Sequence, residues 1–367
     1  MDAYIVSARK YRPAQFEDVV GQQHITGTLK NEIQSGKLAQ AFLFTGPRGV
    51  GKTTCARILA KVINSTEQDD PNQDYSFNIF ELDAASNNSV DDIRSLNEQV
   101  RIPPQTGKYK VYIIDEVHML TASAFNAFLK TLEEPPPYAL FILATTEKHK
   151  ILPTILSRCQ VFNFKRITIS DIANQLQKIA AAEQIQYEPE ALHVIAEKAD
   201  GGMRDALSLF DMMASFGNGN ITYADTAENL NVLDKDFFFK LTDLCHNAEL
   251  SQAIIALHSI LNKGFDPIGI LSGLAEHLRN LMIAKDPQAI KILDMSEKHL
   301  QMYIKQTSGF DMAFLLNALN ICYEFEVNLN RSKNPVFYTE LALMKLCHIR
   351  DLVQLTQTLE EIKKKSS

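Results

Sequence analysis

The sequence contains little cysteine, and what it has is scattered. Its 367 residues include five cysteines and no CxxC pair. That pattern argues against a disulfide framework and against a cysteine-built zinc site. We therefore expect Cys55, Cys159, Cys245, Cys322 and Cys347 to be buried or incidental thiols.

Targeting and membrane segments are missing as well. The chain has no apolar stretch long enough to span a bilayer. The N-terminal residues MDAYIVSARK lack the charged, apolar and cleavage regions of a signal peptide. We therefore expect a cytoplasmic protein with no membrane partner.

A bulk excess of positive charge is also absent. The net charge is −7 and the pI is near 5.8, which is not the profile of a protein that coats nucleic acid by bulk electrostatics. The charge is nevertheless uneven, because residues 9–61 are rich in lysine and arginine while residues 66–98 carry most of a local acidic excess. Any contact with DNA would have to come from local patches, or from several chains acting together.

What the sequence does contain, over its first 165 residues, is an alternation of short apolar runs and helical patterns. This alternation predicts a parallel sheet covered by helices on both faces. The expected strands are Ala41–Thr45, Ile79–Leu82, Val111–Ile114, Leu140–Ala144 and Val161–Phe164, and the expected helices between them include Thr53–Ile63, Val90–Val100 and Ser123–Glu133.

The remainder of the chain has a helical pattern. A small bundle is predicted over residues 170–218 with a break at Gly201-Gly202, and helices resume after a polar turn at residues 217–220. The apolar stripes that support the later helices are Ile270, Leu274, Leu278 and Leu281, and Phe314, Leu315, Ala318 and Leu319. We predict an α/β domain followed by all-α domains, with limits at residues 1–165, 166–222 and 223–360 and a tail at 361–367.

The segment GPRGVGKT, from Gly46 to Thr53, fits the phosphate-binding pattern G-x-x-x-x-G-K-[ST] between a predicted strand and a predicted helix. Its glycines let the backbone fold around an anion with the amide N–H groups pointing inward, at the positive end of the following helix. Lys52 would reach the terminal phosphates and Thr53 would bind Mg²⁺. The predicted nucleotide-binding residues here are Gly46, Pro47, Arg48, Gly49, Val50, Gly51, Lys52, Thr53 and Thr54.

A second segment, VYIIDEVH, is an apolar strand that ends in two acids. Carboxylates at the C-terminal end of a buried parallel strand lie in the crevice where α/β sheets bind ligands. We expect Asp115 to hold Mg²⁺ and Glu116 to orient or deprotonate an attacking water. The two acids could alternatively form a solvated turn or cap a helix. A third strand, LFILATTE, ends in Thr145 and Thr146, whose hydroxyls could hydrogen-bond the attacking water or the γ-phosphate, although threonine is common in strands.

Seven blocks occur in order along the chain: YRPAQFEDVVGQ, GPRGVGKTTCARILAK, ELDAASNNSVDDIR, KVYIIDEVHML, FNAFLKTLEEPP, LATTEKHKILPTILSRCQ and GGMRDALSLFD. Together they closely resemble the gamma/tau subunits of the bacterial DNA polymerase III clamp loader, which are AAA+ ATPases. The resemblance is dense from about Tyr11 to Phe216 and looser in the C-terminal third, where NPVFYTELALMKL resembles the end of the family's collar domain. It implies an AAA+ P-loop NTPase with a parallel five-stranded sheet, a small helical lid domain and a helical collar domain for oligomerisation.

The resemblance also implies roles for two arginines. Arg158 matches the finger that reaches the γ-phosphate held by the next subunit of a ring, a task suited to its permanent, planar charge. Arg204 matches a sensor in the lid that leans over the nucleotide. The alternatives are an ordinary salt bridge for Arg158 and a surface pair between Arg204 and Asp205. Cys159 is expected to be a packed, inert thiol.

Two further groups of residues are implied by the same family. One is a wall beside the adenine base. The other is a helix start that faces DNA, although Ser89 could equally well only cap that helix. The predicted base-side residues are Tyr11, Arg12, Pro13, Val19 and Val20, and the predicted DNA contacts are Ser86, Asn87, Asn88, Ser89 and Arg94.

As a whole, the resemblance implies an ATP-hydrolysing motor subunit that loads the sliding clamp onto primed DNA during replication. Glu116, Arg158, Lys52 and Thr146 would be its catalytic residues, and ATP and Mg²⁺ its cofactors. The implied partners are delta-type and delta-prime-type subunits in a ring, the sliding clamp and primer-template DNA. Two alternatives stay open: another AAA+ DNA motor, such as a branch-migration helicase subunit, and a non-hydrolysing scaffold subunit of the clamp loader.

The sequence departs from the family pattern in one place. Family members usually carry a four-cysteine zinc module between the first helix and the second strand, whereas residues 62–80 here read VINSTEQDDPNQDYSFNIF. Zinc needs thiolate or imidazole ligands, so we expect none to bind there. The chain also stops soon after the collar-like region, and in this it resembles the short gamma-type form.

Overall fold

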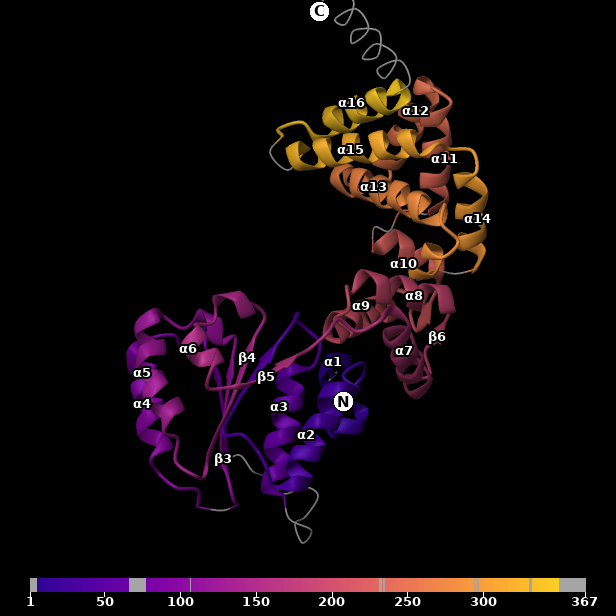
Figure 1. The fold of residues 1–367 in the computed structure, drawn as a ribbon. Helices are drawn as coiled ribbons and strands as arrows, with labels where there is room; N and C mark the ends of the chain where they lie inside the picture. The colour runs from indigo at the N-terminus through magenta and orange to yellow at the C-terminus, as the bar shows by residue number, and fades with distance from the viewer. Residues whose placement is uncertain are drawn as a thin grey trace, which may run out of the picture. The chain divides into compact units, whose positions relative to one another are not determined.

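The computed structural model describes residues 5–65, 77–105, 107–230, 233, 235–293, 295, 297–329 and 332–349. The chain divides into two compact units, Met1–Leu230 and Asn231–Ser367. Figure 1 shows a sheet and its helices in the first unit and helices in the second.

The first unit is built around a five-stranded parallel sheet with the strand order β2-β3-β4-β1-β5. β1 therefore lies inside the sheet, with Phe42 opposite Ile142 of β4 on one side and Gln160 of β5 on the other. The parallel arrangement brings the C-terminal ends of all the strands to one edge. The strands are β1 (Ala41–Thr45), β2 (Ile79–Asp83), β3 (Lys110–Asp115), β4 (Ala139–Thr145) and β5 (Gln160–Asn163).

Helices cover both faces of this sheet (Figure 1). Successive strand residues point to opposite faces, so Phe42 and Phe44 pack under α2 (Gln23–Ser35) and α3 (Lys52–Asn64). Leu43 packs under the opposite layer, which contains α4 (Val90–Val100) and α5 (Ala122–Glu133). The shorter elements are α1 (Ser7–Lys10), η1 (Phe16–Asp18), η2 (Val117–Met119), η3 (Lys148–Lys150) and α6 (Pro153–Leu156).

The lid, which we define as helices α7 to α9 with strands β6 and β7, is followed by α10, and together they complete the first unit. The lid helices are α7 (Ile169–Glu183), α8 (Pro189–Lys198) and α9 (Met203–Phe216), and α10 spans Tyr223–Asn229. β6 (Gln186–Tyr187) and β7 (Asn220–Ile221) form a small parallel pair, which the sequence pattern did not predict. The predicted break at Gly201-Gly202 is confirmed, because α8 ends before it and α9 begins after it.

In the part of the second unit that the structure describes, all the regular secondary structure is helical. Both predicted apolar stripes take part in its core: Ile270, Leu274, Leu278 and Leu281 are at most 2% exposed. The elements are α11 (Lys235–His246), α12 (Leu250–Leu261), α13 (Pro267–Ala284), η4 (Ala289–Ile292), α14 (Glu297–Thr307), α15 (Met312–Leu329) and α16 (Pro335–Cys347). Among the described helices of either unit, none is long and apolar enough to cross a membrane.

Candidate nucleotide-binding site

The glycine-rich loop connects β1 to α3 at the edge where the parallel strands end. Gly46, Gly49 and Gly51 have φ values of 143°, 77° and 103°, in the region that other residues avoid. Gly46 is constrained further, since a Cβ atom there would lie 2.4 Å from the carbonyl oxygen of Phe164. Gly51 is the N-cap of α3, so the loop ends where the helix presents its unpaired backbone N–H groups.

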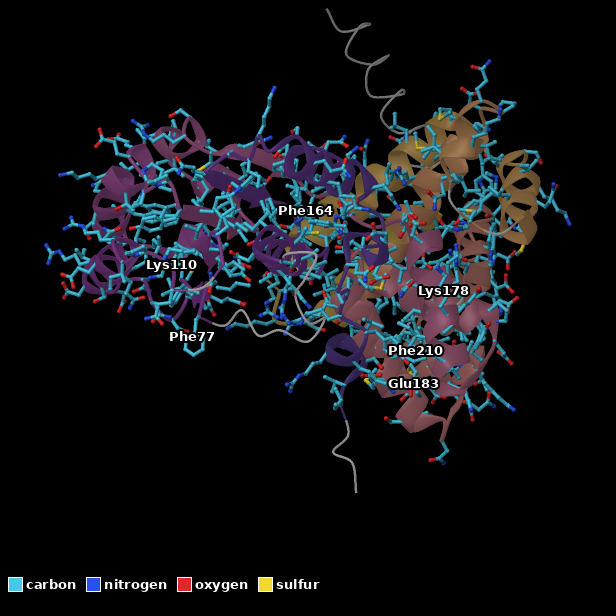
Figure 2. All side chains as sticks on the ribbon, turned by 90° about the horizontal axis from the view of Figure 1, so that it is seen from below. Phe77, Lys110, Phe164, Lys178, Glu183 and Phe210 are labelled. Carbon is cyan, nitrogen blue, oxygen red and sulfur yellow. The ribbon has the colours of Figure 1, made fainter. Side chains whose placement is uncertain are left out.

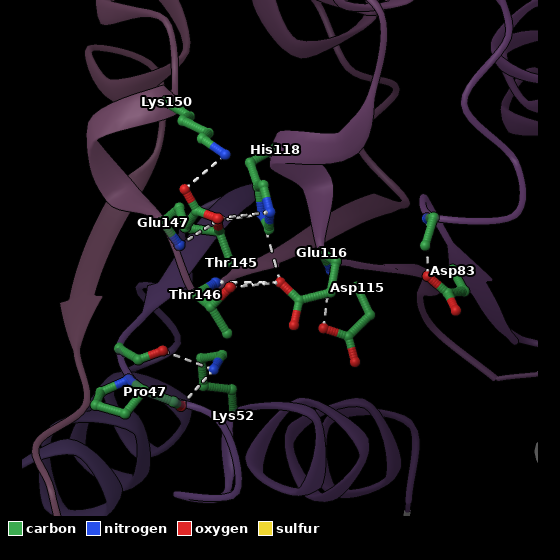
Figure 3. Close-up of polar contacts among 12 residues, drawn as sticks. Pro47, Lys52, Asp83, Asp115, Glu116, His118, Thr145, Thr146, Glu147 and Lys150 are labelled. Atoms are coloured by element: carbon green, nitrogen blue, oxygen red, sulfur yellow. Dashed lines mark hydrogen bonds and ion pairs between the residues drawn. The ribbon is translucent and has the colours of Figure 1, made fainter. Parts of the chain in front are cut away.

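Lys52, the first residue of α3, turns its side chain back over this loop. Its Nζ donates hydrogen bonds of 2.7 Å to the carbonyl oxygens of Gly46 and Pro47 (Figure 3). Lys52 is 6% exposed, and burial lowers its pKa, against the opposing effect of the Glu116 and Asp115 carboxylates. The ammonium group is thus held beside the loop by two carbonyl oxygens, ready to exchange them for an anionic ligand.

Thr53 and Asp115 bring two oxygen ligands together beside the loop. Thr53 Oγ1 donates a 2.7 Å hydrogen bond to Asp115 Oδ2, from the first turn of α3 to the last residue of β3. A hydroxyl and a carboxylate are the kind of oxygen donors that Mg²⁺ takes. These donors, the glycine-rich loop and the lysine fit a nucleoside triphosphate with its magnesium ion.

Glu116 follows directly after β3 in a left-handed conformation, with φ of 46°. Its Oε2 accepts hydrogen bonds from Thr146, at 3.2 Å from the backbone N–H and 3.0 Å from the hydroxyl (Figure 3). These hydrogen bonds join the C-terminal ends of β3 and β4. They leave the Glu116 carboxylate at the rim of the site, joined to Thr146.

His118 and Glu147 belong to the same hydrogen-bonded group, and the sequence reading missed both. His118 Nδ1 lies 3.0 Å from Thr145 Oγ1 and 3.4 Å from Glu116 Oε2, and its Nε2 lies 3.6 Å from Glu147 Oε1 (Figure 3). Glu147 also pairs with Lys150 at 2.7 Å, and this contact is the main reason why its pKa is lowered. The nearest sequence signal was their position, since His118 lies three residues beyond the end of β3 and Glu147 two residues beyond the end of β4.

A cavity of about 190 Å³ opens beside the loop, and both the sheet domain and the lid line it. Most of the predicted nucleotide-binding and catalytic residues lie along its wall, whereas Gly46, Pro47, Thr146 and Arg158 do not. The predicted residues along it are Tyr11, Arg12, Pro13, Val19, Val20, Arg48, Gly49, Val50, Gly51, Lys52, Thr53, Thr54, Asp115, Glu116 and Arg204. Those that were not predicted are Ala8, Asp18, Ile167, Gln175, Ile179, Met203 and Leu207.

The lid meets the loop through the start of α9. The backbone N–H of Arg204 donates to the carbonyl oxygen of Gly49 at 3.4 Å. A larger residue at Gly49 would be strained by the φ of 77°, and its Cβ atom would lie in tight contact with Gly202 Cα, at 3.2 Å. Arg204 itself is exposed and lines the cavity, and no ion pair joins it to Asp205 in the part of the chain that the structure describes.

Arg158 lies apart from this cavity, just after α6. Its guanidinium donates to Glu133 Oε1 at 2.5 Å and to the carbonyl oxygen of Thr154 at 2.7 Å, and the side chain remains one-third exposed. The neighbouring Cys159 is partly buried, and burial raises its pKa to about 12. A thiol with that pKa stays protonated at neutral pH, consistent with the expected inert role.

The predicted DNA-contact residues form the turn before α4 and its first turns. Ser89 caps the helix in a capping box: its hydroxyl oxygen accepts from the Asp92 backbone N–H at 3.2 Å, and the Asp92 carboxylate accepts from the Ser89 backbone N–H at 3.1 Å. Ser86, Asn87 and Asn88 occupy the preceding turn, and Arg94 pairs with Asp91 on the exposed face. Ser89 therefore caps α4, and its contact with DNA stays a prediction.

Comparison with known families matches three models along the chain. They are DNA polymerase III, delta subunit, over residues 21–168, the DNA polymerase III clamp loader subunit ATPase lid domain over 171–219, and DNA polymerase III subunits gamma and tau domain III over 221–362. DNA polymerase III subunit gamma of Buchnera aphidicola subsp. Baizongia pistaciae is 37% identical, over 83% of this chain and 85% of that protein. The chain belongs to the gamma/tau family of DNA polymerase III subunits.

Longer relatives carry the name tau. The gamma/tau family member from Bacillus subtilis, subunit tau, is 39% identical over 94% of this chain but 63% of its own length, and that of Escherichia coli is 38% identical over 82% of this chain and 48% of its own. The chain thus spans less than two thirds of these relatives. A solved structure of RuvB from Thermotoga maritima aligns at a TM-score of 0.49 and 19% identity, over 68% of this chain and 85% of that one.

The predicted fold class is confirmed for this gamma/tau family member: an AAA+ P-loop domain with a parallel five-stranded sheet, a helical lid and a helical C-terminal domain. The expectation that no zinc binds concerns residues 62–80, of which 66–76 lie outside the described residues. It stays a prediction.

Proposed function

We propose that this chain is the ATP-hydrolysing motor subunit of a DNA polymerase III clamp loader. The observation that carries the proposal is the convergence of Lys52, Thr53, Asp115 and Glu116 at one edge of the sheet, beside a glycine-rich loop that fits a triphosphate. Family membership supports the same activity. We also propose the domain limits 1–165, 166–222 and 223–360, with a tail at 361–367.

We assign the contacts to phosphates, Mg²⁺ and base to different residues of the site. The loop amides from Gly46 to Thr54 and the Lys52 ammonium bind the phosphates, and Arg204 contacts them from the lid. Thr53 and Asp115 hold Mg²⁺, which supplies charge neutralisation on the phosphate oxygens when it is bound. Tyr11, Arg12, Pro13, Val19 and Val20 form the base-side wall of the cavity.

Hydrolysis requires a water that is oriented and deprotonated. Glu116 orients the water and accepts its proton, and the Thr146 hydroxyl, now 3.0 Å from Glu116, is close enough to share that water. Arg158 of one copy stabilises the charge that develops on the phosphate bound by its neighbour. Its position outside the cavity of its own chain supports this action in trans.

The implied assembly is a ring with delta-type and delta-prime-type subunits that opens the sliding clamp and grips primer-template DNA. ATP must favour one geometry of that ring over another, since equal affinity for both would shift nothing. Ser86, Asn87, Asn88, Ser89 and Arg94 remain our proposed DNA contacts, because a helix N-terminus and small polar side chains suit phosphate binding.

The proposal is tested by ATPase activity with and without sliding clamp and primed DNA, after mixing with candidate partner subunits. We expect turnover that both clamp and primed DNA stimulate. Negligible turnover in the reconstituted complex would contradict the motor role and favour a scaffold subunit. DNA unwinding without any clamp would favour a branch-migration motor instead.

A further inference from the structure

The N-terminal segment, residues 5–13, is tied to the lid by three polar contacts. The backbone N–H of Ser7 donates to Asp211 Oδ2 on α9 at 2.7 Å. Lys10 Nζ pairs with Glu183 Oε1 at 2.5 Å, and the Tyr11 hydroxyl donates to the same oxygen. α1 also packs against α9. The segment therefore has its polar anchors on the lid, and Figure 2 labels Glu183 there.

Tyr11 takes part both in the cavity wall and in the contact with the lid. It lines the cavity beside Arg12, while its hydroxyl reaches away to Glu183 at the end of α7. Two other residues of α7, Gln175 and Ile179, line the cavity as well. The three α7 positions are four residues apart, so they share one face of the helix, and that face holds the cavity wall at one end and the anchor of Tyr11 at the other.

The protonation states of Tyr11 and Glu183 fix which residue donates and which accepts in their hydrogen bond. Lys10, together with the Tyr11 hydroxyl, lowers the pKa of Glu183, while burial and the nearby carboxylate raise the pKa of Tyr11 to about 12. At neutral pH the tyrosine is therefore a donor and the glutamate an ionised acceptor. Hydrogen bonds to an ionised acceptor are shorter and stronger than those between neutral groups.

We infer that Glu183 is a positioning residue, which fixes the Tyr11 ring as the base-side wall of the cavity and so sets the affinity for the base of the bound nucleotide. The inference rests on the proposed function, since it needs a nucleotide in the cavity. Glu183 does not line the cavity, so it acts through Tyr11. A tyrosine ring that is already fixed loses less conformational freedom when the nucleotide binds. This smaller entropy cost favours binding of the base, which contacts the ring, and does not affect binding of the phosphates.

The test compares a ligand that has a base with one that lacks it. ATP and inorganic tripolyphosphate are titrated calorimetrically, with Mg²⁺, into the full chain and its variants. Glu183→Ala should weaken ATP binding about five- to tenfold, the loss expected for one hydrogen bond to a charged group at a partly exposed site, and leave tripolyphosphate unchanged. Tyr11→Phe should give the same loss, and the double variant no further loss. Glu183→Gln, which keeps an oxygen for the tyrosine hydroxyl but not the charge, should restore only part of the affinity.

Glu188→Ala is the matched control. Glu188 also lies in the lid and accepts a 2.6 Å hydrogen bond from the Tyr223 backbone N–H, but it does not line the cavity, so both ligands should bind as before. Unchanged ATP affinity in Glu183→Ala and Tyr11→Phe would overturn the inference, as would an equal loss for ATP and tripolyphosphate. A wild-type chain that binds neither ligand would overturn the proposed function, and the inference with it.

Discussion

Thr53 Oγ1 and Asp115 Oδ2 lie 2.7 Å apart, joined by a hydrogen bond between the first turn of α3 and the end of β3. The two residues come from separate motifs, 62 positions apart in the chain. Their contact fixes the glycine-rich loop against the acidic strand end. The predictions for the site depend on that alignment.

Lys52→Ala should abolish nucleotide binding. The substitution removes the cation that now contacts the loop carbonyls of Gly46 and Pro47 and that we expect to contact the phosphates. Calorimetry or filter binding with ATP measures the effect. Lys61→Ala, at an exposed position in the last turn of the same helix, is the control and should bind normally. Unchanged ATP affinity in Lys52→Ala would refute the assignment.

Arg158→Ala should keep ATP binding but lose most of the DNA-stimulated turnover in the assembled complex. The reason is that we propose the arginine to act on the nucleotide of the neighbouring subunit, since it is absent from the cavity of its own chain. ATPase assays on the reconstituted complex measure it, and mixing in subunits with an intact arginine should recover the rate. Glu133→Ala removes the ion-pair partner and keeps the guanidinium, so it should remain active; an equal loss there would assign the effect to the ion pair.

Gly46→Ala should lower the free energy of unfolding by more than about 1 kcal/mol, because alanine is strained in this conformation. The backbone has φ of 143°, and the new Cβ would meet the carbonyl oxygen of Phe164 at 2.4 Å. Gly27→Ala is the matched control: it lies within α2 with open space around it and should stabilise by roughly 0.5–1 kcal/mol. Urea unfolding of both variants checks the contrast, and a neutral Gly46→Ala would contradict it.

His277 should make the second unit sensitive to acid. Burial lowers its pKa to about 4, and it sits between the Tyr303 hydroxyl and Gln306 Oε1. Below pH 6.5 this histidine is protonated in the unfolded chain, whereas in the folded unit it is protonated only below about pH 4. Stability is therefore intact above pH 6.5 and falls as the pH drops through that window, by roughly 3 kcal/mol.

Unfolding of the second unit by urea at several pH values measures this loss. His277→Gln should flatten the slope between pH 6.5 and 4, because glutamine does not titrate. His149→Gln, at an exposed histidine in the first unit, should leave the slope unchanged. A slope that survives in His277→Gln would assign the effect to other groups.

Native Cys55, Cys159 and Cys322 should react slowly with iodoacetamide at pH 8. Burial raises the pKa of each to about 12, so the reactive thiolate is scarce. Mass spectrometry of labelled peptides measures the rate, and the same protein in urea provides the comparison. Fast labelling of native Cys159 would show that it is more open than the structure indicates.

The sheet could be predicted from sequence because its central strands β1, β3 and β4 are mostly apolar runs and because strand-like and helical patterns alternate along the chain. The predicted Ala41–Thr45 matches β1, and the other four strands were placed within one residue at each end. β6 and β7 could not be found in this way. Each has two residues, too few to show any period, and their pairing depends on how the lid helices pack.

The candidate site was predictable where its chemistry follows from short spacing, as in Gly46–Thr53 and in the Asp115-Glu116 pair. It was not predictable where residues meet only after folding. Glu183 reaches Tyr11 across 172 positions, and nothing near either residue marks the contact. His118 was visible in the sequence, but its approach to Thr145 depends on the register of β3 against β4.

The interior place of β1 also bears on how the protein is made. When β1 leaves the ribosome, neither of its neighbours yet exists, because they arrive only with Ala139–Thr145 and Gln160–Asn163. Until then the nascent chain carries a mostly apolar strand with both edges unpaired, the kind of species on which chaperones act. The glycine-rich loop is thus synthesised early, but the sheet that supports it is completed late, when the last strand has docked.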